Sequence, residues 1–179
     1  MVLVFLANGF EEIEALATVD ILRRAGLAVT TVGVGGEYVT GTHGIVVKAD
    51  CGDASAFPNE VQAVVLPGGI PGTPNLEASA VVQGCVDTAV EQGAYVCAIC
   101  AAPSILGHKG LLRGKRATCY PGFETELTDA ILSDESVVQD GTIITAKGAG
   151  VTVDFALCIV SALVSSDVAR DLGEKMQCR

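Results

Sequence analysis

The sequence predicts an α/β fold in which a mostly parallel sheet lies between two layers of helices. Short apolar runs rich in Val and Ile alternate along the chain with segments whose apolar residues recur at helical spacing. Half of the 179 residues are apolar but only 4% are aromatic, so the core must be aliphatic, which suits parallel strands buried on both faces. No linker, repeat or low-complexity tract divides residues 1–179, and we expect a single domain.

Residues 1–34 predict a β-α-β unit. Residues 2–7 form an apolar strand, residues 10–25 a helix that ends at Gly26, and residues 27–34 a second strand. Crossovers of this kind are right-handed and join parallel strands. Apolar residues at helical spacing mark the expected buried side of the helix: Ile13, Leu16, Ala17, Ile21 and Leu22.

The next segment predicts a hairpin, one further strand and one further helix. Before the helix we expect a hairpin of residues 37–40 and 44–49, a loop over residues 51–59, a strand over residues 61–66, and an irregular Gly- and Pro-rich loop over residues 67–72. Asn75 is then predicted to cap a helix that runs to about Gln92 and ends at Gly93.

A short strand followed at once by a sharp turn lies near the middle of the chain. Tyr95–Ile99 is an apolar run, and small residues from Cys100 to Ala102 reverse the chain before a helix begins at Ser104. Such a turn, a nucleophile elbow, lifts Cys100 out of the sheet and leaves backbone N–H groups free to face a ligand. A cysteine thiolate is a strong nucleophile at neutral pH. The alternative is that Cys100 is a small buried apolar side chain, as most free cysteines are.

The remaining residues predict short elements followed by two closing helices. In order, we expect a turn at residues 110–114, a strand at 116–119, a short helical segment from Pro121, a hairpin of residues 136–139 and 142–146, a helix that follows residues 148–150 and ends at Leu163, and a helix over residues 167–176.

The composition excludes several classes of partner. The net charge of −10 opposes binding to nucleic acid or to an anionic membrane, and no apolar run approaches the ~20 residues of a membrane span. The first residues lack the basic region of a signal peptide, so we interpret them as a strand and expect a cytoplasmic protein. No G-x-G-x-x-G or G-K-[ST] motif occurs, and we expect no cofactor.

The seven cysteines are an odd number without regular spacing, so we expect thiols. Cys97 and Cys100 form a C-x-x-C, but Cys97 falls inside the predicted strand, where residues three apart point to opposite faces; this disfavours a redox pair. His43 and His108 are the only histidines and there is no second cysteine pair, so we expect no metal site.

Glutamates follow the first strand, at the sheet edge where ligands gather in such folds. Glu11 and Glu12 are expected to be ordinary charges at a helix N-terminus. Glu14 lies beside the apolar stripe, and the local pattern leaves a solvated charge and a buried acid both open. Burial would raise the pKa of Glu14 and let it donate a hydrogen bond to a Cys100 thiolate or to a sulfinate. We therefore predict that Cys100 is mostly thiolate at neutral pH.

The pair Gly68-Gly69 carries backbone N–H groups that no side chain shields, which is what an oxyanion hole requires. A plain turn is the alternative interpretation.

Five blocks of the sequence resemble the ThiJ/PfpI superfamily, in the branch of the Parkinsonism-associated deglycase and its bacterial relatives. In family order they are G-F-E-E-I-E (9–14), D-I-L-R-R-A-G (20–26), V-V-L-P-G-G (64–69), A-I-C-A-A-P (98–103) and K-G-A-G-V-T-V-D-F-A-L (147–157).

The resemblance implies a flavodoxin-like sandwich, similar to class I glutamine amidotransferases, that forms a homodimer. It implies a reactive Cys100, a partner acid at Glu14, and oxyanion-binding amides at Gly69 and Ala101. Cys51, in C-G-D-A-S, matches a family cysteine near the dimer interface.

The sequence departs from the family pattern at its histidines. Tyr120 precedes Pro121 where some members have histidine, and Ala101 stands where the protease-like branch has one. His108 lies about two helical turns after the elbow, where we expect a structural role. With no histidine base, a Cys-His hydrolase is disfavoured, and any chemistry depends on Cys100 with Glu14 as the proton carrier.

Two functions from different classes remain open. One is a cofactor-independent glyoxalase or deglycase, acting on reactive dicarbonyls such as methylglyoxal or on their early protein adducts. The other is an oxidative-stress sensor or redox chaperone that works through oxidation of Cys100. A role in thiamine-precursor biosynthesis or proteolysis ranks third.

Overall fold

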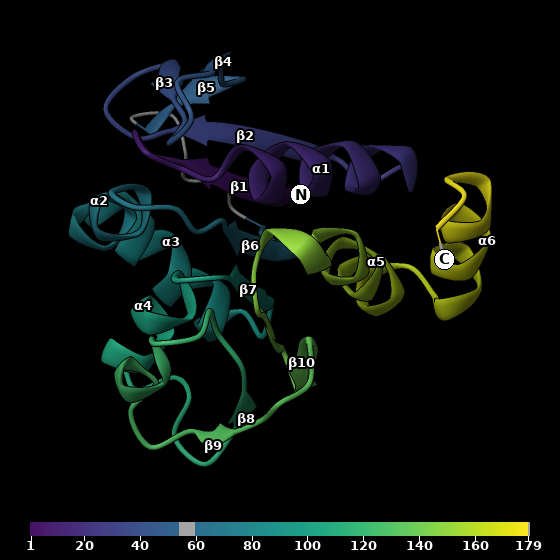
Figure 1. Ribbon diagram of the computed structural model, residues 1–179. Coiled ribbons are helices and arrows are strands. Elements are labelled where there is room, and N and C mark those ends of the chain that lie inside the picture. The colour runs from purple at the N-terminus through teal and green to yellow at the C-terminus, as the bar shows by residue number, and fades with distance from the viewer. Residues whose placement is uncertain (54–59, 179) are drawn as a thin grey trace.

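The computed structural model in Figure 1 describes residues 1–53 and 60–178. The strands are β1 (Val2–Leu6), β2 (Val29–Gly33), β3 (Tyr38–Thr40), β4 (Val46–Lys48), β5 (Cys51–Gly52), β6 (Ala63–Leu66), β7 (Tyr95–Ile99), β8 (Arg116–Ala117), β9 (Ile131–Leu132), β10 (Val137–Asp140) and β11 (Ile143–Ala146). The helices are α1 (Glu12–Arg24), α2 (Gly72–Ala78), α3 (Ala80–Glu91), α4 (Pro103–His108), α5 (Thr152–Leu163) and α6 (Ser166–Lys175), with 3-10 turns η2 (Glu124–Glu126) and η3 (Ala149–Val151).

Seven of the described strands form one sheet, in the order β10-β11-β7-β6-β1-β2-β5. Neighbouring strands are parallel except β10 and β11, which form the predicted antiparallel hairpin. The predicted hairpin of β3 and β4 is also present, as a separate pair. The mostly parallel α/β fold is therefore confirmed.

Helices cover both faces of the sheet, and the side chains of β1 show why. Val2, Val4 and Leu6 pack into a core with α1 and α5, whereas Leu3 and Phe5 pack into a second core with α3 and α4. Figure 1 shows α1, α5 and α6 toward the right of the strands and α2, α3 and α4 toward the left. All five β1 residues are buried, as expected for a strand covered on both faces.

The order and register of the central strands bring three chain reversals together. β1, β6 and β7 are adjacent, and Leu66 of β6 lies opposite Ala98 of β7. All three strands run in the same direction, so their carboxyl ends meet at one edge. Asn8, Gly68 and Cys100 follow these three strands by two residues or fewer. The fold thus places the segments that carry the predicted site side by side.

The helix α1 begins later than predicted. It buries Ile21 and Leu22 as expected, but its first turn faces the core with a different side. The Glu11 carboxylate accepts the Glu14 N–H at 2.7 Å and caps the helix, so Phe10 lies outside it although fully buried. Ile13, which was expected on the buried side, is 56% exposed, whereas Glu14 is 1% exposed. The helix is rotated so that Glu14 reaches the loop after β6, where Gly68 donates a hydrogen bond to it.

The single helix predicted from Asn75 to Gln92 is in fact two helices. α2 begins at Gly72, inside the stretch that was expected to be irregular, and ends at Ala78. Ser79 has an extended backbone, and its hydroxyl accepts the Val82 N–H at 3.3 Å, which caps α3. A capping serine inside an otherwise continuous helical pattern therefore accounts for the break.

Two short strands were not predicted. Cys51–Gly52, expected in a loop, forms β5 and extends the sheet by pairing with β2. Residues 54–59 of that predicted loop lie outside the described residues. Ile131–Leu132 forms β9, which pairs with β8 in a small parallel pair. Two-residue strands are defined by their distant partners, which local periodicity does not encode.

None of the described helices combines the length and the apolar character that crossing a membrane requires.

Candidate active site

Cys100 lies at the strand-to-helix turn that the sequence predicts. β7 ends at Ile99, α4 begins at Pro103, and Cys100 between them has φ +66°, a left-handed conformation that is unfavourable for a side chain with a Cβ. Two backbone hydrogen bonds hold it there. Its N–H donates to the Ala146 carbonyl at 2.9 Å, and its own carbonyl accepts the Tyr120 N–H at 2.8 Å. β11 and the segment after β8 therefore fix the position of the thiol.

Glu14 is a buried acid with few hydrogen-bond donors. Its Oε2 accepts the Gly68 N–H at 2.8 Å, while Oε1 is buried without a hydrogen-bond partner among the described residues. Burial raises the pKa of Glu14 to about 7, against the lowering effect of the Gly68 and Cys100 hydrogen bonds. A carboxyl group in this position is readily protonated near neutral pH.

Gly68 leaves the space in which the acid and the thiol meet. A Cβ at this position would lie 2.6 Å from Cys100 Cβ and 2.8 Å from Glu14 Oε2. Gly69 has φ +97°, and a Cβ there would lie 2.4 Å from the Gly9 carbonyl oxygen. Both glycines are therefore required by close approach, and Gly69 also by its backbone conformation. The plain-turn interpretation does not account for this packing.

The sulfur of Cys100 faces two backbone amides and one acid. Burial and the negative charge of an ionised Glu14 raise the pKa of Cys100 to about 12, while the N–H groups of Ala101 and Gly69 lower it. Glu14 and Cys100 are in contact, so they release protons as a pair, the first near pH 7 and the second near pH 12. Between these values the pair holds one proton and one negative charge. The four predicted site residues, Cys100, Glu14, Gly69 and Ala101, are thus brought together.

A cavity of about 350 Å³ opens beside this pair, lined by Tyr120, Pro121, Lys147 and residues 148–151. A Cβ on Gly148 would lie 3.8 Å from Glu14 Oε1 and 3.3 Å from the Tyr120 ring, so the unpartnered carboxyl oxygen lies close to the wall of the cavity. Tyr120 is half exposed and offers an aromatic ring there.

Cys97 lies on the same side of the sheet as Cys100, not on the opposite one. Cys97 is fully buried in the core formed with α1 and α5, and Cys100 packs against that same core. The expectation of opposite faces assumed that both residues belong to the strand, but the left-handed turn redirects Cys100. Both are free thiols, and burial raises the pKa of Cys97 well above its usual value.

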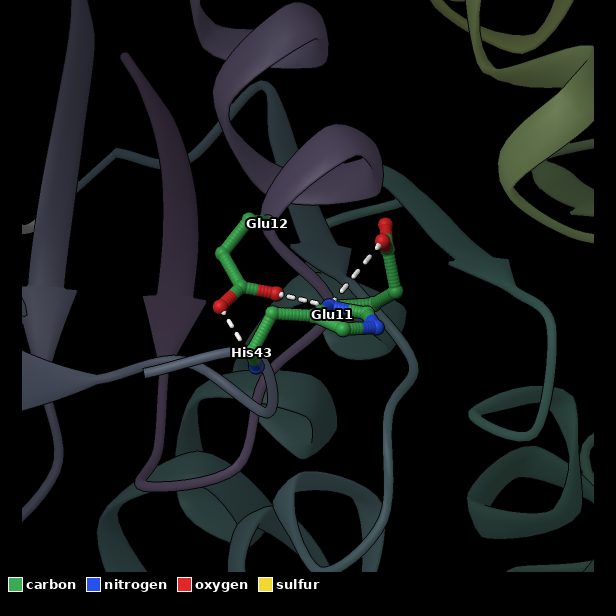
Figure 2. A group of neighbouring side chains, drawn as sticks. All are labelled: Glu11, Glu12 and His43. Carbon is green, nitrogen blue, oxygen red and sulfur yellow. Dashed lines mark hydrogen bonds and ion pairs between the residues drawn. The ribbon is translucent and has the colours of Figure 1, made fainter. Parts of the chain in front are cut away.

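Glu12 is buried and paired, contrary to the prediction of an ordinary surface charge. Figure 2 shows His43 folded over it: the His43 N–H donates to Oε1 at 2.7 Å, and Nδ1 lies 2.8 Å from Oε2. Burial raises the pKa of Glu12, but the bonds from His43 outweigh it and hold that pKa below its usual value. With Glu11, these side chains place three potential metal-ligating atoms within 4.8 Å of one another. The pairing with His43 satisfies Glu12 and anchors the β3–β4 hairpin loop to α1.

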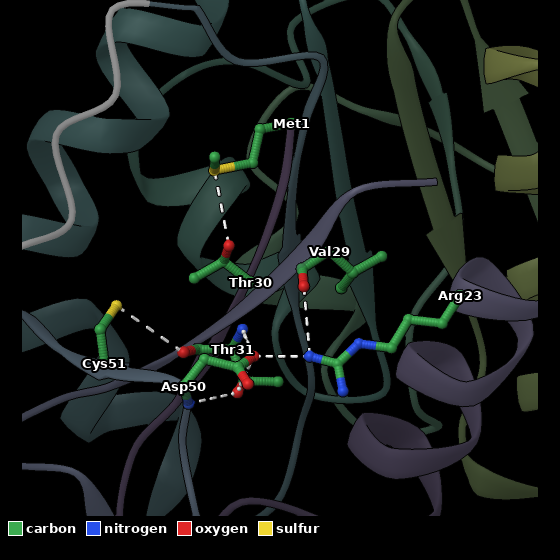
Figure 3. Close-up of polar contacts among 7 residues, drawn as sticks. All are labelled: Met1, Arg23, Val29, Thr30, Thr31, Asp50 and Cys51. Carbon is green, nitrogen blue, oxygen red and sulfur yellow. Dashed lines mark hydrogen bonds and ion pairs between the residues drawn. The ribbon is translucent and has the colours of Figure 1, made fainter. Parts of the chain in front are cut away.

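Cys51 lies in a different region, on β5, which three strands separate from β7 in the sheet order. Figure 3 shows the Asp50 carboxylate beside it, where Oδ2 accepts the Thr31 N–H and hydroxyl at 2.8 Å and Arg23 at 2.6 Å. The Cys51 thiol points to the Thr31 carbonyl at 3.9 Å. Burial, together with Asp50 and Glu37, raises the pKa of Cys51.

The sequence and the fold of this chain match known proteins. A family model described as the DJ-1/PfpI family matches residues 1–162. The chain belongs to the DJ-1/PfpI family. It is 35% identical over 175 residues to Protein dj-1beta of Drosophila melanogaster, covering 96% of this chain and 94% of that one. It is 32% identical over 164 residues to the Glutathione-independent glyoxalase DJR-1.2 of Caenorhabditis elegans, covering 90% and 87%.

Solved structures of family members superpose closely. A cysteine-to-alanine mutant of a DJ-1 superfamily protein from Salmonella typhimurium gives a TM-score of 0.95 at 35% identity, over 99% of this chain and 98% of that one. Oxidized DJ-1 of Toxoplasma gondii gives 0.95 at 31% identity, over 99% and 97%. The resemblance seen in the five sequence blocks is therefore confirmed as family membership and as fold.

Sequence analysis missed the role of Gly68 as the hydrogen-bond donor to Glu14. The Gly68-Gly69 pair was noted only as a source of oxyanion-binding amides. The two consecutive glycines after a buried strand could have indicated this role, because each glycine allows another segment to approach its backbone closely.

Proposed function

We propose that this protein is a cofactor-independent thiol enzyme acting on reactive dicarbonyls, or on their early protein adducts, as a glyoxalase or deglycase. The observation that carries the proposal is the Glu14–Cys100 pair, which loses its first proton near pH 7 and lies beside two amide donors. The N–H groups of Gly69 and Ala101 face the sulfur, whereas the backbone N–H of Gly68 alone donates to the carboxyl. We infer that the proton rests on Glu14 and the charge on sulfur.

For methylglyoxal the first step is addition of the thiolate to the aldehyde carbon. The carbonyl π electrons move to oxygen, the Gly69 and Ala101 amides stabilise that oxyanion, and the protonated Glu14 delivers its proton to it. The product is a hemithioacetal on Cys100. Glu14 is then a carboxylate, and the amides are no longer facing a free thiolate.

Glu14 next moves a proton between two adjacent carbons. The carboxylate removes the hydrogen from the carbon bonded to sulfur, giving an enediol, and then protonates the neighbouring carbon. The former aldehyde carbon is now a thioester, and the former ketone carbon an alcohol. Water cleaves the thioester to lactate and frees the thiol. The oxidation of one carbon balances the reduction of its neighbour, so no external oxidant or cofactor enters.

A second candidate function is oxidation sensing by the same thiolate. A peroxide would oxidise Cys100 first to a sulfenic and then to a sulfinic acid. The carboxyl of Glu14, which retains an unpartnered oxygen, supports this candidate because a protonated acid can donate to a sulfinate. In this case Glu14 stabilises a product and carries no proton between carbons.

We further propose that the chain acts as a homodimer in the cytoplasm, without nucleic acid or membrane partners. Exposed apolar side chains on α1 and the β3–β4 hairpin, Ile13, Ile45 and Val46, support a self-association surface. The cysteines, described as free thiols, suit a reducing compartment. Light scattering should give twice the 18.3 kDa of one chain; a single-chain mass at micromolar concentration contradicts the dimer.

Turnover of methylglyoxal to lactate by the purified protein, without glutathione, tests the enzymatic function. We expect steady turnover that Cys100→Ser abolishes and that Cys119→Ser, a buried thiol elsewhere, retains. We expect Glu14→Gln to abolish turnover while the sulfur still oxidises to sulfinate. Wild-type protein that forms sulfinate but no lactate would favour the sensor.

A further inference from the structure

The loop between β3 and β4, residues 41–45, lies against the two chain segments that carry the candidate active site. One segment follows β1 and leads to Glu14, and the other follows β6 and holds Gly68 and Gly69. The position of one segment relative to the other sets the geometry of the acid and the oxyanion-binding amide. Contacts that join the two segments therefore bear on the reaction, although the mechanism above uses no side chain of this loop.

Thr42 contacts both segments. Its N–H donates to the Phe10 carbonyl at 2.8 Å, in the segment after β1. Its hydroxyl donates to the Ile70 carbonyl at 3.0 Å, one residue after Gly69 in the segment after β6. Within the loop as the structure describes it, Thr42 alone forms hydrogen bonds with both segments.

The two segments are also bonded directly, at the two ends of a turn. The Glu11 N–H donates to the Gly68 carbonyl at 2.9 Å, and the Gly72 N–H donates to the Gly9 carbonyl at 3.1 Å. The turn at residues 69–71 lies between these bonds in the sequence. The hydroxyl bond described above is made inside that turn, beside the amide that faces the sulfur.

The β3–β4 hairpin loop is itself anchored, so the Thr42 hydroxyl acts from a fixed backbone. His43 binds both oxygens of Glu12 through its N–H and its ring (Figure 2), and the Gly9 N–H donates to the Thr40 carbonyl at 2.7 Å. Thr42 is exposed, but hydrogen bonds of its neighbours on both sides hold its place. Such support by residues outside the reacting set is what keeps catalytic groups in productive geometry.

We propose that Thr42 is a positioning residue for the reaction at Cys100: its hydroxyl holds the turn at residues 69–71 so that the Gly69 N–H points to the oxyanion. This assignment rests on the proposed function for the reaction itself. The ionisation of the Cys100 thiol also reports the position of that amide and needs no turnover. The Gly69 N–H lowers the pKa of Cys100, so turning this amide away from the sulfur should raise that pKa.

Thr42→Val removes the hydroxyl and keeps the shape of the side chain and the backbone N–H. With methylglyoxal we expect kcat to fall about three- to tenfold and KM to change less than about twofold, because the amide stabilises an oxyanion that forms only during the reaction. The midpoint of Cys100 ionisation, followed by thiolate absorbance in the ultraviolet, should rise by about half a pH unit.

Two further variants act as controls. Thr42→Ser restores the hydroxyl and should return kcat and the thiolate midpoint close to their wild-type values. Thr30→Val makes the same chemical change at the opposite end of the sheet, where the Thr30 hydroxyl donates to the Met1 sulfur at 3.5 Å (Figure 3). This control should change neither quantity.

A merely structural threonine would lower the Tm of Thr42→Val and leave the ionisation of Cys100 in the folded protein unchanged. An unchanged thiolate midpoint in Thr42→Val therefore overturns the proposal, and so does an equal shift in Thr42→Ser. If wild-type protein does not turn over methylglyoxal, the proposed function fails, and the thiolate midpoint alone decides whether Thr42 positions the Gly69 amide.

Discussion

Two regions of this protein place a carboxyl group beside a half-buried cysteine, and the pKa of that carboxyl is lowered in one region and raised in the other. Beside Cys51, Asp50 accepts three hydrogen bonds, from Thr31 and Arg23, and these bonds hold its pKa below the usual value although burial pushes it up. Beside Cys100, Glu14 accepts one backbone N–H, from Gly68, and has Cys100 itself as its other partner, and burial raises its pKa to about 7. The supply of donors, not the exposure of the sulfur, distinguishes the two sites.

The sulfurs differ in the same sense. The Cys51 thiol points to a backbone carbonyl, which favours the protonated form, and it lies beside a permanently ionised Asp50. The Cys100 sulfur faces two amide N–H groups beside an acid that holds a proton near neutrality. We infer that a cysteine becomes reactive where the backbone N–H groups donate to its sulfur and few of them donate to the neighbouring carboxyl.

The largest effect concerns stability around Glu14. Its folded pKa is raised, so between about pH 4.5 and about pH 7 the folded state binds more protons than the unfolded state and stability falls as pH rises. Glu14→Gln removes this ionisable group. The change that it causes in the free energy of unfolding should therefore be more favourable at about pH 8 than at about pH 4, by up to about 3 kcal/mol. Urea unfolding at both pH values measures this; parallel stability–pH curves for the two proteins contradict it.

Next in size is the packing of Gly68. A methyl group there would lie 2.6 Å from Cys100 Cβ, so Gly68→Ala must displace the thiol or the acid. We expect methylglyoxal turnover to fall about a hundredfold. Gly52→Ala in β5 is the matched control, because a Cβ at that position meets only Gly36 backbone atoms at 3.9 Å and the turnover should stay near that of wild type. Equal turnover in both variants would mean that the close approach at Gly68 is not needed.

The selectivity of alkylation compares the two cysteines directly. Iodoacetamide at neutral pH should modify Cys100 about tenfold faster than Cys51, since only the thiolate reacts, and the Gly69 and Ala101 amides stabilise a thiolate at Cys100 whereas the Cys51 sulfur faces the Thr31 carbonyl. Peptide mass spectrometry over time gives both rates in one sample. Comparable rates, or faster modification of Cys51, would remove the distinction.

The smallest effect concerns Asp50. Its lowered pKa means that its ionised form stabilises the fold above its usual pKa and loses that contribution as pH falls through the lowered value. The Asp50 side chain is about half exposed, so solvent screening reduces the effect, and Asp50→Asn should cost about 1 kcal/mol or less near pH 7. Thermal unfolding at neutral pH checks this, and the cost should shrink in acid.

The sequence predicted the elements that depend on local pattern. Tyr95–Ile99 and the small residues after it were sufficient to predict the elbow, because an apolar strand and a tight reversal are both local properties. Glu14 was a candidate on its spacing alone, but its buried environment was not predictable, since its donor Gly68 is 54 residues away. The expected burial of Ile13 was also wrong, since the side of α1 that faces the core depends on contacts with distant segments such as Gly68.

Pairing between distant segments limited the rest. The burial of Glu12 depends on His43, 31 residues further on, and the strand at Cys51 depends on β2. The prediction that the pKa of Cys100 is lowered by the elbow amides and by a protonated Glu14 differs from the structure, where burial and the charge of an ionised Glu14 raise it. Motifs located the reactive groups, but only the packed structure shows how the pair shares its proton.

The pH dependence of thiolate absorbance in the ultraviolet tests this sharing most directly, measured on wild type, Glu14→Gln, Glu14→Leu and Cys100→Ser. We predict that one thiolate, absent from Cys100→Ser, is present once the pair holds a single proton, because the Gly69 and Ala101 amides favour the negative charge on sulfur. Glu14→Gln, which keeps a donor, should retain the thiolate at neutral pH, and Glu14→Leu should raise the thiol pKa. A wild-type Cys100 that stays protonated until the pH exceeds the usual cysteine value of about 8.5, or that ionises identically in Glu14→Leu, would contradict the account.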